Sequence, residues 1–185
     1  MAENRQTISL APYPAAAEQS DGRPALPDIA QDMKAVVGGR LDRVGMSGIE
    51  IALRLRNSEG ETVLTPARAT AQISLDDPDV KGVHMSRLFL ALHKTVEEDE
   101  FTMGMVDRLL HAFVDSHSDI SGSSYTDFSF EYMAKRSSLL SDHVTWRSYP
   151  VRVEGELREG ESEHRLHVSV AYSSTCPCSA ALARQ

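Results

Sequence analysis

Residues 85–117 read MSRLFLALHKTVEEDEFTMGMVDRLLHAFVDSH, and this stretch decides the fold class. Its apolar residues recur every three or four positions over Met85–Val96 and again over Val106–His117. This spacing predicts two amphipathic helices, each with one apolar face. The acidic run Glu97–Glu100 separates the two patterns, and acidic side chains there suit the N-terminus of the second helix.

On both sides of the helices the period changes to two residues. Alternating apolar and polar residues occupy the stretches Gly48–Arg56, Ala67–Asp76, Thr126–Lys135, Ser148–Leu157 and Glu163–Ser173. Such alternation is typical of antiparallel strands with one buried face. Turn residues at Asn57–Gly60 and Arg158–Glu161 join neighbouring strands, which predicts hairpins at both places.

The order of these elements predicts the fold class. We expect strand, strand, helix, helix, strand, strand (ββααββ), with an additional strand considered around Arg136–Thr145. Helices grouped between hairpins indicate an α+β fold, in which an antiparallel sheet carries two helices on one face.

The composition limits the classes of protein to which the chain can belong. Its 185 residues carry 19 Lys and Arg against 27 Asp and Glu, a formal net charge of −8. No apolar run of about 18 residues occurs, and Met1–Leu10 carries no apolar stretch of the signal-peptide type, so neither a membrane span nor a standard secretion signal is expected. An acidic chain without a basic stripe is not expected to bind nucleic acid.

The patterns begin only after a stretch of different composition. Residues 1–25 are rich in Pro, Ala, Ser and Gln, and we expect a disordered tail there. The remainder, residues 26–185, is long enough for one module with its own core. The two cysteines, Cys176 and Cys178, flank a single proline, which makes an internal disulfide a poor fit. Two free thiols suit a reducing compartment, so we expect a cytoplasmic location.

The first candidate site is Cys176-Pro177-Cys178-Ser179. It follows the last predicted strand and precedes a stretch that looks like the first turn of a helix. The N-terminus of a helix lowers the pKa of a cysteine and favours the thiolate, which binds metals or attacks carbon centres. Two small residues at a strand end would show the same pattern, so both interpretations stay open.

The second candidate site is the segment Val80–Leu88, a glycine-containing loop that opens a helix. Free backbone N–H groups together with nearby basic side chains suit an anion such as phosphate. Alternatively this is an ordinary helix start, with Ser86 as the cap and the charges solvated, and taken alone the segment fits that interpretation better. Elsewhere, His164 and His167 are three apart on a predicted strand, so they point to opposite faces and cannot form a ligand pair.

Taken together, these segments resemble the type IB GTP cyclohydrolases. Lys81–Leu88 and Cys176–Ser179 look like the two signature stretches of that family, and Leu26-Pro27-Asp28 followed by Val44-Gly45-Met46 is similar to its opening segment. The resemblance runs from about Leu26 to Gln185. It implies a tunnelling fold (T-fold), in which antiparallel sheets from several modules join into a barrel with the helices outside.

The resemblance also implies an activity and its requirements. GTP would be opened at its imidazole ring, releasing formate and giving 7,8-dihydroneopterin triphosphate, the first pterin of folate biosynthesis. A divalent metal would activate the attacking water, and this metal is zinc, or manganese or iron in some members. The expected partners are GTP and further copies of the chain in a homo-oligomer, a tetramer.

Site residues follow from the resemblance position by position. Cys176 matches the family's metal-binding cysteine, and Cys178 in the same segment is the second choice for that position. Both cysteines are candidates for the catalytic site. His84, Ser86 and Arg87 match the other signature stretch, and we assign them to substrate binding at the triphosphate. Family members continue beyond the cysteine segment, so we expect this chain to be the first of two tandem modules, with the remaining metal ligands outside it.

Two other functions stay open at this point. The first is a non-catalytic T-fold module or fragment, which would assemble and bind a purine or pterin without turnover. A nitrile reductase with a cysteine nucleophile shares the same fold, but the Cys-Pro-Cys-Ser context argues against it.

Overall fold

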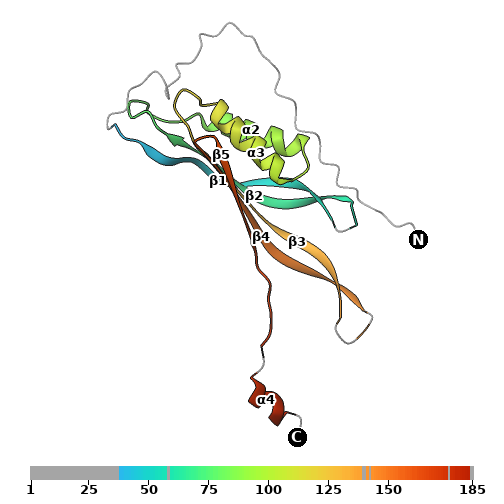
Figure 1. Cartoon of the computed structure of the whole chain (residues 1–185). Helices are drawn as coiled ribbons and strands as arrows, with labels where there is room; N and C mark the ends of the chain where they lie inside the picture. The colour runs from blue at the N-terminus through green and yellow to red at the C-terminus, as the bar shows by residue number, and fades with distance from the viewer. Residues whose placement is uncertain (1–37, 58, 139–140, 142, 175, 184–185) are drawn as a thin grey trace, which may run out of the picture.

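The computed structural model describes residues 38–57, 59–138, 141, 143–174 and 176–183, in which a five-stranded antiparallel sheet carries two helices on one face (Figure 1). The strands are adjacent in chain order: β1 (Leu41–Arg56), β2 (Thr62–Leu75), β3 (Ser124–Ser137), β4 (Val144–Arg158) and β5 (Glu161–Val168). The helices are α2 (Met85–Glu98), α3 (Met103–Asp115) and the short α4 (Pro177–Leu182). The predicted α+β class is therefore confirmed.

Two expectations fall outside this description. The tail predicted over residues 1–25 and the segment Leu26–Asp28 lie outside the described residues. In the described ranges, no helix combines the length and the apolar character needed to cross a membrane.

Several strand boundaries differ from the predicted ones. β1 begins at Leu41, before the predicted start at Gly48, because register shifts on both sides of Val44–Met46 interrupt the alternation that sequence patterns detect. β5 ends at Val168 instead of Ser173. The segment considered as an additional strand, Arg136–Thr145, instead contains the end of β3 and the start of β4. The order is consistent with ββααββ, and β5 follows as a fifth strand at the sheet edge.

Both predicted hairpin turns are confirmed. The side chain of Asn57 accepts hydrogen bonds from the backbone N–H groups of Glu59 and Glu61, each at 2.9 Å, which closes the turn between β1 and β2. Glu159 and Gly160 form the β4–β5 turn with positive φ angles of 51° and 82°. Positive φ at both central residues is the conformation that matches the twist of a two-residue hairpin.

The hydrophobic core lies between the helices and one face of the sheet. α2 buries Leu88, Leu92 and Val96, whereas α3 buries a wider face of Met105, Val106, Leu109, Leu110 and Phe113. α3 lies so close to β4 that a Cβ on Gly155 would stand 2.6 Å from Val106 Cγ1. Met85 and Phe89 were predicted to join the apolar face of α2, but they are 38% and 41% exposed. The rest of the fold covers only the stripe of α2 formed by Leu88, Leu92 and Val96.

The acidic run between the helices does not lie where the sequence suggested. Glu97 and Glu98 end α2, and within the described ranges the first turn of α3 carries no acidic residue, so the predicted support of its N-terminus is wrong. Asp99 instead forms an ion pair with Arg108, with 2.8 Å between the nitrogen and oxygen atoms. Thr102 is the N-cap of α3, and its hydroxyl oxygen accepts from the backbone N–H of Met105 at 3.1 Å.

Replacing Thr102 by alanine is expected to lower the free energy of unfolding by about 1 kcal/mol, because the helix loses its N-terminal cap. Urea denaturation of the purified chain measures this change. Thr102→Ser keeps the hydroxyl and is expected to stay close to the parent value. Equal losses in both variants would show that the methyl group, and not the cap, carries the effect.

Candidate functional site

The signature segment Lys81–Leu88 opens α2. Its N-cap is His84, with extended backbone angles, and Ser86 lies exposed in the first turn, so the alternative in which Ser86 caps the helix is wrong. The guanidinium of Arg87 donates from Nη1 to the backbone carbonyl of Ser116 at 3.1 Å. The start of α2 is therefore tied to the end of α3.

A buried histidine makes the second tie between the two helices. The backbone N–H of His84 donates to Nε2 of His117 at 3.2 Å. His117 is fully buried, and its Nδ1 lies 2.8 Å from the Ser116 hydroxyl oxygen and 3.3 Å from the Phe113 carbonyl oxygen. Because the backbone N–H is only a donor, Nε2 accepts and the proton of the neutral ring is on Nδ1. Burial lowers the pKa of His117, with smaller contributions from the charge of Arg87 and from His84.

The cysteine segment forms the start of a helix, as predicted. Cys176 is the N-cap of α4, Pro177 is its first helical residue, and both Cys176 and Cys178 are exposed free thiols. Hydrogen bonds from the backbone N–H groups of Ser179 and Cys178 lower the pKa of Cys176. The thiolate, which is the metal-binding and nucleophilic form, is thus favoured at Cys176.

The structure does not bring the two signature segments together within one chain. α4 lies at the end of an extended segment beyond the sheet, far from the helix layer that contains His84, Ser86 and Arg87 (Figure 1). Among the residues that the structure describes, no group of three His, Cys, Asp or Glu side chains is placed to hold a metal ion. Cys176 fits the chemistry of one ligand, whereas the described residues do not form a complete metal site.

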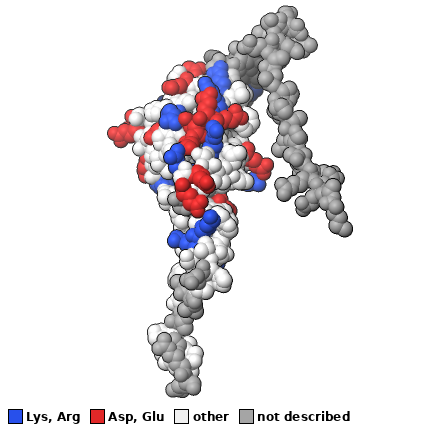
Figure 2. Space-filling view, turned by 90° about the vertical axis from the view of Figure 1, so that its right-hand side faces the viewer, with Lys and Arg blue, Asp and Glu red and all other residues white. Residues whose placement is uncertain are grey.

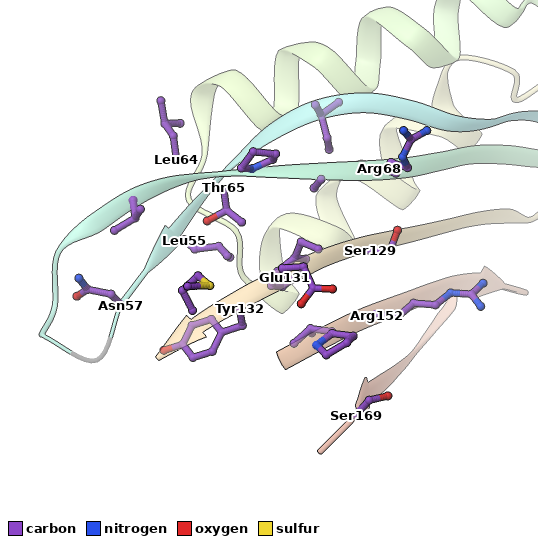
Figure 3. A pocket seen from close by; sticks show the side chains of 18 of the residues that line it. Leu55, Asn57, Leu64, Thr65, Arg68, Ser129, Glu131, Tyr132, Arg152 and Ser169 are labelled. Atoms are coloured by element: carbon purple, nitrogen blue, oxygen red, sulfur yellow. The ribbon is translucent and has the colours of Figure 1, made fainter. Parts of the chain in front are cut away.

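A large groove lies between two diverging hairpins. β2 and β3 pair only as far as Ala67 and Phe130, and beyond these residues the β1–β2 and β3–β4 hairpins separate (Figure 3). The groove has a volume of about 1010 Å³ and includes Leu64, Tyr132 and Trp146 among its lining residues. The sequence pattern did not reveal this groove, because it depends on where the pairing of β2 with β3 stops.

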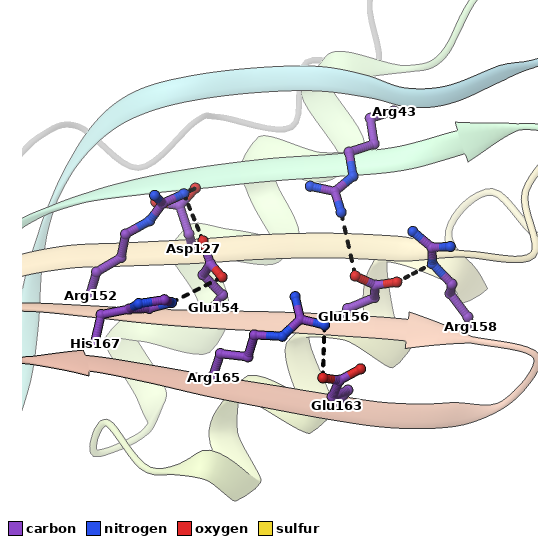
Figure 4. Close-up of polar contacts among 9 residues, drawn as sticks. All are labelled: Arg43, Asp127, Arg152, Glu154, Glu156, Arg158, Glu163, Arg165 and His167. Carbon is purple, nitrogen blue, oxygen red and sulfur yellow. Dashed lines mark hydrogen bonds and ion pairs between the residues drawn. The ribbon is translucent and has the colours of Figure 1, made fainter.

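The sheet face opposite the helices carries a set of ion pairs over β1, β3, β4 and β5 (Figure 4). Its members are Arg43, Asp127, Arg152, Glu154, Glu156, Arg158, Glu163, Arg165 and His167. Arg152 bridges Asp127 and Glu154 at 3.5 and 3.0 Å. The hydrogen bond from His167 lowers the pKa of Glu154, and the charge of Arg152 adds to this effect. Because each carboxylate in this set contacts a basic group, these charges largely neutralise one another. On the face drawn in Figure 2, acidic and basic groups likewise lie side by side.

The two histidines of β5 lie on opposite faces of the sheet, as predicted. His167 Nε2 is 3.2 Å from a carboxylate oxygen of Glu154 on the helix-free face. His164 Nε2 is 3.1 Å from Asp107 Oδ1, which belongs to α3 on the other face. The second contact ties the edge strand to the helix layer.

Comparison with known proteins places these features in a family. Residues 26–185 match the family model described as type I GTP cyclohydrolase folE2. The chain is 42% identical over 160 residues to GTP cyclohydrolase FolE2 of Hydrogenovibrio crunogenus, covering 86% of this chain and 51% of that protein. It is 37% identical over 161 residues to GTP cyclohydrolase FolE2 of Bdellovibrio bacteriovorus, covering 87% of this chain and 53% of that protein.

These matches define both the family and the extent of the similarity. The chain spans about half the length of the curated relatives that it matches. The matched region contains both signature segments and every described strand and helix. The chain belongs to the type I GTP cyclohydrolase FolE2 family.

Proposed function

We propose that this chain acts in a GTP cyclohydrolase of type IB, which hydrolyses GTP to 7,8-dihydroneopterin triphosphate and formate in the first step of folate biosynthesis. The family match over residues 26–185 carries the proposal, because it includes both Lys81–Leu88 and Cys176–Ser179. Relatives that share this region are named GTP cyclohydrolase FolE2. The antiparallel sheet with two helices on one face is consistent with a T-fold module, the first of two in the family.

In this proposal Cys176 contributes one ligand to a divalent metal. Backbone N–H groups at the start of α4 favour its thiolate, and the side chain is exposed and accessible. Zinc, manganese or iron bound there would lower the pKa of a water molecule and supply hydroxide near neutral pH. The other ligands come from outside the described residues, and Cys178 is the second candidate within them.

The start of α2 is proposed to bind the triphosphate of GTP. Backbone N–H groups at the N-terminus of a helix and a guanidinium group are both suited to phosphate oxygens. Arg87 uses Nη1 for the Ser116 carbonyl, and its other N–H groups remain suitable for phosphate. His84 and Ser86 complete the segment, with Ser86 exposed in the first turn.

The separation of the two segments favours a site assembled from more than one copy. A homo-oligomer, which we propose to be a tetramer, could bring the cysteine segment of one protomer to the α2 start of another. The outer strands β1 and β5 are sheet edges, and exposed edges favour pairing with another chain. The two exposed free thiols suit the reducing cytoplasm, which is the proposed location.

Formate release is the test of the proposed activity. We expect the protein expressed from its full coding sequence to convert GTP, with zinc or manganese, to equal amounts of formate and dihydroneopterin triphosphate. Formate is measured in an enzyme-coupled assay, and the pterin by fluorescence after oxidation. A folded oligomer that yields neither product with zinc, manganese or iron would refute the proposal. Binding of GTP without formate release would instead support a non-catalytic module.

A further inference from the structure

We propose that His117 is a positioning residue for the triphosphate-binding segment, because its buried ring holds the backbone of His84 and so orients Ser86 and Arg87. This inference rests on the proposed function of that segment. His117 does not contact the substrate in this proposal, and it acts through the main chain at the start of α2.

The hydrogen bond from the His84 N–H to His117 replaces a capping hydrogen bond that α2 cannot make with its own side chains. In a common helix start, the third residue is Glu or Gln, and its side chain accepts from the backbone N–H of the N-cap residue. In α2 that third position is Arg87, which has N–H donors and no acceptor. The acceptor for the His84 N–H comes instead from His117, at 3.2 Å. This arrangement leaves a basic side chain where an anion would bind.

Contacts with α3 fix the orientation of the His117 ring. Its Nδ1 is within hydrogen-bond distance of both Ser116 and the Phe113 carbonyl, which determines the direction of Nε2. α3 itself is fixed by the buried side chain of Phe113 and by its close approach to β4 at Gly155. The Ser116 carbonyl also accepts from Arg87. One end of α3 thus positions both the backbone and a basic side chain of the binding segment.

This arrangement requires a neutral ring. The groups that face His117 are the His84 N–H and ring and the Arg87 guanidinium from α2, and Ser116 and the Phe113 carbonyl from α3. Protonation of Nε2 would place an N–H against the N–H of His84 and remove the acceptor. Since the pKa of His117 lies below its ordinary value of 6.5, the bond is intact above that pH. The stability that it adds is lost as pH falls through the lowered pKa.

Two amide substitutions at His117 distinguish a positioning role of its ring from a packing role. The carboxamide oxygen of His117→Gln can reach about where Nε2 lies, whereas the shorter side chain of His117→Asn ends about where Nδ1 lies. We expect His117→Asn to raise the Kd for GTP about tenfold, the size expected for one lost hydrogen bond. His117→Gln is expected to keep the Kd for GTP close to the parent value. It is also expected to abolish the weakening of GTP binding at acid pH, because the carboxamide does not titrate. His111→Asn, at an exposed position on the same helix, is the control and is expected to match the parent.

Amide hydrogen exchange at His84 provides a readout that does not depend on GTP. The exchange is expected to be slow in the parent and in His117→Gln, and fast in His117→Asn, relative to other α2 amides. In the parent it is expected to accelerate as pH falls below the pKa of His117, after correction for the intrinsic rate. This parent measurement decides the inference even if a variant fails to fold.

The outcomes for the inference and for the proposed function are distinct. If the parent does not bind GTP but His84 exchange follows the expected pattern, the proposed function of the segment fails while the hydrogen bond to His117 stands. If GTP binds and His117→Asn and His117→Gln weaken it equally at every pH, the positioning role is refuted. His84 exchange that does not respond to either variant or to pH would also overturn it.

Discussion

Cys176→Ser is expected to lower the rate of formate release by about 100-fold or more, since even residues that support a metal ligand cost 10- to 100-fold when changed. Cys178→Ser is expected to have the smaller effect. The reason is the position of Cys176 at the start of α4, where the backbone N–H groups of Cys178 and Ser179 stabilise its thiolate. A serine hydroxyl stays protonated at neutral pH and is a poor ligand for zinc.

Thiol alkylation tests the same difference without enzymatic activity. With iodoacetamide near neutral pH, Cys178→Ser is expected to react faster than Cys176→Ser, because it retains the thiol with the lowered pKa. Both side chains are exposed, so each variant should stay within about 0.5 kcal/mol of the parent in urea denaturation. A larger loss of activity in Cys178→Ser than in Cys176→Ser would indicate that Cys178, and not Cys176, is the metal ligand.

Gly45→Ala is expected to lower the free energy of unfolding by about 3 kcal/mol or more, the upper range for overpacking. A Cβ at this position would lie 2.0 Å from the carbonyl oxygen of Ala71 and 2.7 Å from Cα of Gln72. These are backbone atoms of the paired strand β2, so they cannot move aside as a side-chain tip would. The change therefore strains the β1–β2 pairing next to the bulges of β1.

Gly104→Ala is the matched control for this experiment. At Gly104 a Cβ would meet its nearest atom at 3.7 Å, an ordinary contact, and the residue lies in the first turn of α3. Alanine has the higher helix propensity, so this variant should gain up to about 1 kcal/mol. Urea denaturation of both variants measures the contrast. A Gly45→Ala protein as stable as the parent would mean that β1 and β2 separate more easily than their contacts suggest.

The candidate site could be predicted in part from the sequence. Cys176 and the start of α2 were identified because helix starts and thiols have local signatures, and the structure confirms that a helix begins within each segment. The helical spacing over Val106–His117 predicts only that His117 lies on the apolar face of the second helix. Its contact with His84 joins residues 33 positions apart, and no local pattern encodes that pairing. The groove between the hairpins was missed for the same reason.

The sequence by itself determined the α+β class, both helices and the hairpin turns, because periodicity and turn chemistry act over a few neighbouring residues. The two signature segments were recognised from their resemblance to a known family. The tertiary structure alone decided the bulged start of β1, the exposure of Met85 and Phe89, and the ring of His117 beneath the start of α2. These features depend on which surfaces meet when the helices pack on the sheet. Such contacts join distant parts of the chain, and their geometry is set by close packing instead of local preference.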